Sequence, residues 1–181
     1  MLEEANNDFR VENVMRWDKY KIMENINSFN SAARSHIYFV LTDQDTNDRC
    51  PPNAINELAE PLHPNLLYRF SVMEVESWVL AHREAISRFL SIPLNKIPHK
   101  TDDIVKPKEC LVNMARSSKS SNIRKDIVPR NNSTSKVGPD YNGRLIKFVL
   151  CHWDVRIASQ VSPSLERTFE RLTNFTATRP V

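Results

Sequence analysis

Two short apolar runs, at residues 36–42 and 66–72, set the strictest limit on the fold of this chain. Each run is typical of a buried strand, and each is followed by residues with a helical pattern. Strands that alternate with helices favour an α/β fold, in which the connecting helices leave the strands parallel. We therefore predict a three-layer α/β domain with a largely parallel sheet, a central strand at 36–42 and a helical C-terminal part.

The other predicted elements rest on periodicity and on turn residues. Residues 9–15 alternate apolar and polar side chains, which predicts a short strand. Residues 117–137 combine serine, asparagine and basic side chains without periodicity, which predicts a long basic loop. At 181 residues the chain is expected to form one domain. Helices are predicted where apolar residues recur at helical spacing or where a proline opens a first turn, over residues 19–34, 51–60, 74–90, 107–116, 141–151 and 162–172.

The composition excludes several kinds of site. Only 2 of the 181 residues are glycine, and both the phosphate loop of Walker-type ATPases and the dinucleotide fingerprint need more. The 3 cysteines are odd in number and far apart, which argues against a disulfide framework. Cys151 and His152 are adjacent, a spacing that rarely lets two side chains share a zinc ion.

Charge and hydropathy indicate where the protein is expected to work. No apolar run approaches the roughly 20 residues that a membrane helix needs. The first residues have neither the basic region nor the apolar region of a signal peptide, so we expect a cytoplasmic protein without membrane contact. The net charge of +3 is too small to imply a nucleic-acid partner by itself.

Acidic residues follow both predicted strands. Asp43 and Asp45 come at the end of the first strand, and Glu74 and Glu76 come after the second. Sheets of this kind bind ligands at the carboxyl ends of their strands, and Mg²⁺ is held by one or two carboxylates together with water and phosphate. Purely structural roles are the alternative for these acids, because aspartates favour turns and glutamates stabilise the start of a helix.

The functional hypothesis is a divalent-metal site. Asp43 and Asp45 would hold Mg²⁺ or Mn²⁺ with Glu76 as a third ligand, and Glu76 or Glu74 would act as the general acid or base. On a helix that begins there, Glu74 and Glu76 lie about 200° apart, so at most one of them faces a given site. The basic run between residues 116 and 136 adds cations that suit phosphate contacts. The candidate phosphate-binding residues are Lys108, Arg124, Lys125 and Lys136.

The alternative for this basic run is a surface that binds nothing. A cluster of like charges is usually a solvated surface, and no aromatic residues are interleaved to stack on bases. The sequence alone does not decide between a phosphate-binding segment and a solvated one.

The order of motifs resembles a bacterial domain-of-unknown-function family that looks TOPRIM-like, similar to the metal-binding domain of topoisomerases and primases. The resemblance covers about residues 9–175 and is carried by Phe39-Val-Leu-Thr-Asp-Gln-Asp45, Cys50-Pro51, Arg69-Phe-Ser-Val-Met-Glu-Val-Glu-Ser-Trp-Val-Leu-Ala81, Lys106-Pro-Lys108, Lys136-Val-Gly-Pro-Asp-Tyr141 and Ser162-Pro-Ser-Leu165. It implies that Asp43 and Asp45 bind Mg²⁺. It also implies an ATPase partner in a phage-defence or mobile-element system.

The chain departs from the TOPRIM pattern at its start. The pattern has a glutamate at the end of an earlier strand, but the first residues here look helical, and Glu3 and Glu4 are poor substitutes. We therefore expect that the first strand of the family is missing and that the N-terminus is shortened, which leaves open whether the protein is an enzyme. One hypothesis is a divalent-metal-dependent phosphoryl-transfer domain of the nuclease type. The alternative is a non-catalytic, N-terminally shortened TOPRIM-like module that binds a partner protein or nucleic acid.

Overall fold

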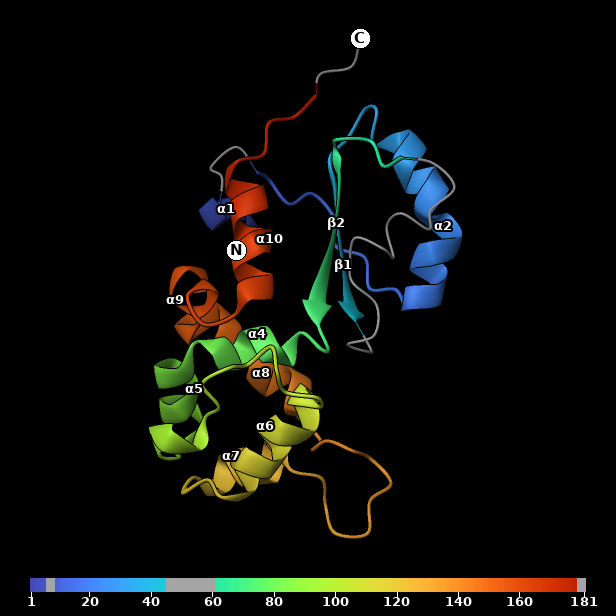
Figure 1. Ribbon diagram of the computed structural model, residues 1–181. Coiled ribbons are helices and arrows are strands. Elements are labelled where there is room, and N and C mark those ends of the chain that lie inside the picture. The colour runs from blue at the N-terminus through green and yellow to red at the C-terminus, as the bar shows by residue number, and fades with distance from the viewer. Residues whose placement is uncertain (6–8, 45–60, 179–181) are drawn as a thin grey trace. The chain divides into compact units, whose positions relative to one another are not determined.

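The computed structural model describes residues 1–5, 9–44 and 61–178 (Figure 1). These residues form two compact units, where the length of the chain predicts one domain. The sheet unit consists of residues 1–72 and 167–181, and the helical unit of residues 73–166. The predicted helix at 51–60 lies outside the described residues.

The sheet unit contains two parallel strands, β1 (Tyr38–Gln44) and β2 (Leu66–Val72). Both predicted strands and their direction are confirmed, although β1 begins and ends two residues later than the predicted 36–42. Their register pairs Tyr38 with Leu66 and Gln44 with Val72. In the residues that the structure describes, the sheet has no further strand, so it is smaller than the sequence predicts.

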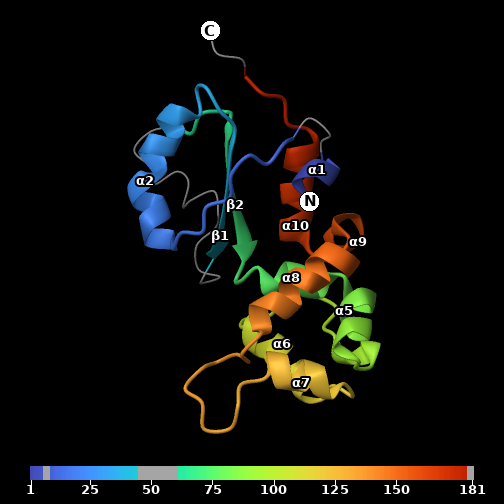
Figure 2. The ribbon, with the colours of Figure 1, turned by 180° about the vertical axis from the view of Figure 1, so that it is seen from behind.

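Alternate side chains of the strands point to opposite faces of the sheet, and each face is covered. On one face, Val40 and Tyr68 pack with Ile26 of helix α2 (Lys19–Ala32). On the other face, Leu67 packs with Leu172, which belongs to the last part of α10 (Pro163–Thr173). Figures 1 and 2 show α2 and the end of α10 on opposite sides of the two strands. The unit is therefore a small α/β arrangement with a helix on each face.

The strand predicted at residues 9–15 is wrong, because these residues have no regular secondary structure. Phe9 stacks on Phe175 with ring centroids 5.5 Å apart. The apolar residues that alternate after it, Val11 and Met15, are exposed instead of lining a sheet face. Of these apolar residues, Phe9 is partly buried by its contact with Phe175, and no described strand pairs with the segment.

The helical unit contains α4 (Glu76–Ala81), α5 (Arg83–Leu90), the 3₁₀ turn η1 (Leu94–Lys96), α6 (Pro107–Arg116), α7 (Ser121–Ile127), α8 (Tyr141–His152), α9 (Val155–Ser159) and the first turn of α10. The predicted helices at 107–116, 141–151 and 162–172 are confirmed. Its core includes Leu80, Ile86, Leu111, Ile127 and Phe148, all fully buried. Helices α8 to α10 make up the helical C-terminal part that the sequence predicts.

The helix predicted at 74–90 is broken at His82, whose backbone (φ −81°, ψ 71°) is not helical. The His82 ring is buried, and its Nδ1 accepts a hydrogen bond from the backbone N–H of Asp154, 3.0 Å away. This contact joins residues that are 72 positions apart in the sequence. A periodicity argument over 74–90 therefore misses the break between α4 and α5.

The predicted loop at 117–137 contains a helix, so this prediction is wrong over α7. Ser120 caps α7, because its hydroxyl accepts a hydrogen bond from the backbone N–H of Ile123. Ile123 and Ile127 are buried one helical turn apart, although the residues between them are polar. Residues 128–137 do form a loop, and this loop is called the basic loop below.

The basic loop is closed at its far end by Gly138. The backbone N–H of Gly138 donates to the carbonyl of Ile127 at 2.8 Å. A Cβ atom at position 138 would lie only 2.4 Å from the carbonyl oxygen of Asp126. Glycine is therefore required here for the close approach of two backbones.

Candidate functional site

The two acids predicted to be catalytic, Glu74 and Glu76, meet around Lys108, a predicted phosphate ligand. The backbone N–H of Lys108 donates to Glu74 Oε2 at 2.7 Å. Its Nζ lies 3.7 Å from Glu74 Oε1 and 3.5 Å from Glu76 Oε1. Lys108 is in the first turn of α6 and Glu76 is the first residue of α4, so the ends of two helices create this contact. The lysine compensates the charge of the acids.

Tyr141 completes this group, which we call the Glu–Lys–Tyr cluster. Its phenol donates a hydrogen bond to Glu76 Oε1 at 3.0 Å. Burial raises the pKa of Tyr141, and the negative charges of Glu76 and Glu74 raise it further. Tyr141 therefore stays protonated and remains a donor. The Glu76 side chain is only 6% exposed. It contacts Lys108 from α6 and Tyr141 from α8.

Only two of the three predicted metal ligands lie in the part of the chain that the structure describes. Asp43 is the last residue but one of β1 and accepts a hydrogen bond from Ser71 Oγ at 2.6 Å. Asp45 lies outside the described residues, and Asp43 and Glu76 belong to different units. Among the described residues, no group of three or more His, Cys, Asp or Glu side chains is placed to hold a metal ion. The Mg²⁺ or Mn²⁺ site with Asp43, Asp45 and Glu76 stays a prediction.

A second feature of the helical unit is a hollow of about 430 Å³ beside α6, which we call the basic hollow. Arg116 comes from the end of α6, and Arg130 and Lys136 come from the basic loop. Polar side chains fill the spaces between these cations, and Glu109 is the one acid among the lining residues described. The lining residues are Glu109, Val112, Asn113, Arg116, Pro129, Arg130, Asn131, Ser133, Ser135 and Lys136.

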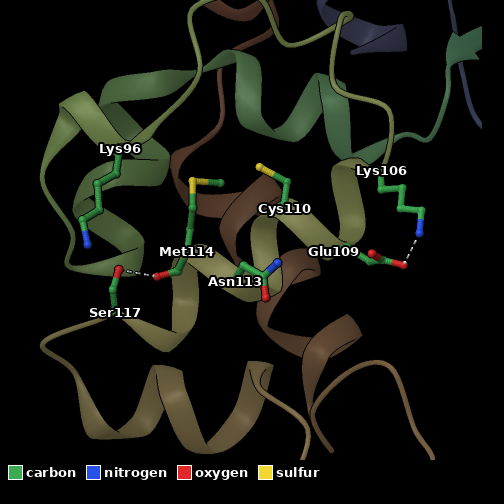
Figure 3. A pocket seen from close by; sticks show the side chains of 7 residues that line it. All are labelled: Lys96, Lys106, Glu109, Cys110, Asn113, Met114 and Ser117. Atoms are coloured by element: carbon green, nitrogen blue, oxygen red, sulfur yellow. Dashed lines mark hydrogen bonds and ion pairs between the residues drawn. The ribbon is translucent and has the colours of Figure 1, made fainter.

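A further hollow of about 570 Å³ lies on the same helix and is called the sulfur hollow (Figure 3). Cys110 and Met114 lie between Lys96 on one side and Lys106 on the other. Lys106 Nζ is 3.3 Å from Glu109 Oε1. The remaining lining residues are Asn113 and Ser117. Most of these residues recur at helical spacing on α6. Glu109 and Asn113 are exposed, Cys110 is half-buried, and Met114 is buried with the core residues Leu111 and Ala115.

The structure separates the predicted phosphate-binding residues. Lys136 lines the basic hollow, whereas Lys108 is paired with the two glutamates. The Arg124 guanidinium donates to the carbonyl of Ser118. Neither Arg124 nor Lys125, both described on α7, is among the residues that line the two hollows.

Sequence reasoning includes Arg116 and Arg130 only as members of the basic run, and it misses Lys96. The helical spacing of Lys106, just before α6, with Asn113 and Arg116 on α6 is a further signal for part of this surface. Lys96 carries no such signal, because it enters the sulfur hollow from η1, outside the basic run.

One motif that carried the family resemblance has a structural role. Asp102 accepts hydrogen bonds from Ser162 Oγ at 2.6 Å and from the backbone N–H of Ser164 at 2.8 Å. These bonds satisfy donors at the beginning of α10. The indole of Trp78 donates to Ser164 Oγ at 2.7 Å. The sequence Ser162-Pro-Ser-Leu165 therefore holds the start of a helix in place.

No family model matches the sequence, and no curated protein and no solved structure matches the chain. The TOPRIM-like resemblance therefore stays a prediction. None of the described helices combines the length and the apolar character needed to cross a lipid bilayer.

Proposed function

We propose that the protein binds the sugar–phosphate backbone of a nucleic acid through the basic hollow. The observation that carries this proposal is the convergence of Arg116, Arg130 and Lys136 on one hollow from two separate segments. Within the described residues, none of these three cations forms an ion pair with a carboxylate. Arginine, lysine, serine and asparagine side chains are the usual partners of nucleic-acid phosphates.

The Glu–Lys–Tyr cluster supports binding more than catalysis. Glu76 receives a hydrogen bond from Tyr141 and lies next to the Lys108 ammonium group, so its charge is already compensated. A metal ion at Glu76 would lie beside the Lys108 ammonium group, whose positive charge opposes the binding of a cation. The alternative of a non-catalytic binding module is therefore favoured over a metal-dependent enzyme that uses Glu74 or Glu76.

The binding proposal is tested by fluorescence anisotropy with labelled oligonucleotides at several salt concentrations. The variant Arg116→Ala/Arg130→Ala/Lys136→Ala should bind more weakly at every salt concentration. Its salt slope should fall by about 2 to 3, because each neutralised phosphate contributes ~0.7 to 0.9. Lys100→Ala/Lys147→Ala/Arg156→Ala is the matched control, since it removes three exposed cations that line neither hollow.

The control variant should keep most of the affinity of the wild type. Equal losses in the two variants would mean that binding follows net charge and not the basic hollow. Absence of any binding by the wild-type protein at low salt would refute the proposed function.

A second candidate function is divalent-metal-dependent phosphoryl transfer in the sheet unit. The observation in its favour is that Asp43 lies at the carboxyl end of β1 in a parallel pair of strands. Asp43 accepts a hydrogen bond from Ser71 Oγ on the neighbouring strand, which holds its carboxylate at this end of the sheet. Isothermal calorimetry with Mg²⁺ and Mn²⁺ on the wild type and on Asp43→Asn tests it, followed by a nuclease assay. Identical metal binding by the two proteins would argue against this site.

A further inference from the structure

The basic hollow and the sulfur hollow adjoin along α6. Glu109 and Asn113 line both of them, so the two hollows share a border on the exposed side of this helix. Cations lie beyond this border in each direction. Lys96 and Lys106 belong to the sulfur hollow, and Arg116 belongs to the basic hollow.

The two hollows differ in chemistry. Figure 3 shows the sulfur atoms of Cys110 and Met114 turned to the same side of α6, between the two lysines. Burial raises the pKa of the Cys110 thiol, so the thiol is neutral at physiological pH and adds no negative charge. Methionine sulfur is polarizable and makes favourable contacts with flat ring systems. The sulfur hollow therefore has uncharged, polarizable sulfur groups between two lysines. The lining of the basic hollow is polar and cationic.

We propose that the two hollows form one track for single-stranded nucleic acid, in which the sulfur hollow receives an unpaired base and the basic hollow holds the phosphates that follow it. This inference rests on the proposed function and specifies its ligand. The volume of about 570 Å³ lies within the ~300–1,000 Å³ of ordinary small-molecule sites, which is enough for a base. A base in a duplex would have to leave its stack first, at a cost of a few kcal/mol.

Glu109 has a defined part in this track. It is the shared acid of the two hollows, and its ion pair neutralises Lys106 in the free protein. A phosphate of the bound nucleic acid has to compete with the Glu109 carboxylate for the Lys106 ammonium group. Glu109→Gln removes this competition and should raise the affinity for single strands.

Thiol protection tests the position of the base directly. The wild-type protein is alkylated with a maleimide, with and without a single-stranded oligonucleotide, and the extent at each cysteine is read by peptide mass spectrometry. Bound DNA or RNA should slow alkylation of Cys110 severalfold. Cys151 lines neither hollow and is exposed, so its rate is the internal control. Binding with an unchanged rate at Cys110 would overturn the inference.

A second measurement uses strand form and variants. Wild-type protein should bind a single strand more tightly than a duplex of the same sequence at equal salt. Lys96→Ala/Lys106→Ala should lower the salt slope for single strands by about 1.4, from ~0.7 per lost phosphate contact, with little change for the duplex. If single strand and duplex bind equally and the two-lysine variant behaves like the wild type, the single-strand track is refuted. The proposal that the basic hollow binds phosphates would then be unaffected. If no nucleic acid binds, the proposed function itself has failed.

Discussion

The phenol of Tyr141 donates a hydrogen bond to the buried carboxylate of Glu76, across 3.0 Å and 65 positions of sequence. This contact joins the first turn of α8 to the first turn of α4. Lys108 approaches the same carboxylate oxygen from α6. Three helices of the helical unit are therefore joined at one carboxylate.

Tyr141→Phe should destabilise the protein by about 1–3 kcal/mol, because it leaves one buried oxygen of Glu76 without its donor. Urea unfolding followed by circular dichroism measures this change. Tyr20→Phe removes a hydroxyl from a side chain that is 84% exposed and is the matched control, with no expected effect. Equal stabilities of the two variants would mean that the Tyr141 hydrogen bond contributes nothing.

Lys108→Ala should lower stability more than Lys125→Ala, because Lys108 neutralises two glutamates and Lys125 has an exposed side chain on α7. Neither substitution should change the affinity for oligonucleotides, since neither residue lines the two hollows. Thermal unfolding and anisotropy titrations give both quantities. A loss of affinity in Lys125→Ala with unchanged stability would contradict this prediction and would mean that α7 belongs to the nucleic-acid-binding surface.

His82 should make the helical unit less stable in mildly acidic solution. Burial lowers the pKa of His82 from its ordinary value of 6.5; the nearby Asp154 and Glu84 oppose this shift, and Arg88 adds to it. The unfolded chain therefore binds a proton at a higher pH than the folded protein does. The stability contributed by neutral His82 is complete above pH 6.5 and is lost as the pH falls from 6.5 toward the lowered folded pKa.

Urea midpoints between pH 7.5 and 5 measure this dependence. His82→Gln should show a smaller loss of stability over the same range, whereas His99→Gln, at an exposed position, should behave like the wild type. The same pH dependence in His82→Gln and the wild type would assign the effect to other groups.

The two glycines should respond in opposite ways to alanine. Gly138→Ala forces a Cβ against the Asp126 carbonyl and should destabilise the protein and loosen the basic loop. Gly143 is exposed within α8, and a Cβ there meets only the flexible side chain of Asp140. Gly143→Ala should therefore be neutral or stabilising by up to about 1 kcal/mol, from the higher helix propensity of alanine. Thermal melts of both variants test the pair, and similar destabilisation in both would contradict the structural distinction.

Much of the secondary structure follows from local pattern. The strands at 38–44 and 66–72 and helices α2, α6, α8 and α10 are predictable, because their apolar residues recur at the period of the element that forms. The break at His82 is not predictable, since a backbone N–H from Asp154 decides it. Helix α7 is hidden by its polar composition, because only Ile123 and Ile127 mark its buried side.

The candidate site is less predictable than the fold. The sequence predicts Glu74, Glu76 and Lys108 as candidate site residues, but it does not show that their charges neutralise one another. That pairing depends on how α4 and α6 pack. The two hollows likewise depend on tertiary packing, since Lys96 and Arg130 approach α6 from separate segments.

The closure of the basic loop at Gly138 separates the scaffold from its recognition surface. The hydrogen bond from Gly138 to Ile127 fixes the two ends of residues 128–137 without using any side chain of that segment. Loops with fixed ends tolerate insertions and replacements at small energetic cost. The basic loop, which carries Arg130 and Lys136, can therefore be replaced by another sequence while the helices keep their packing. Such replacements offer a route to new ligand preferences.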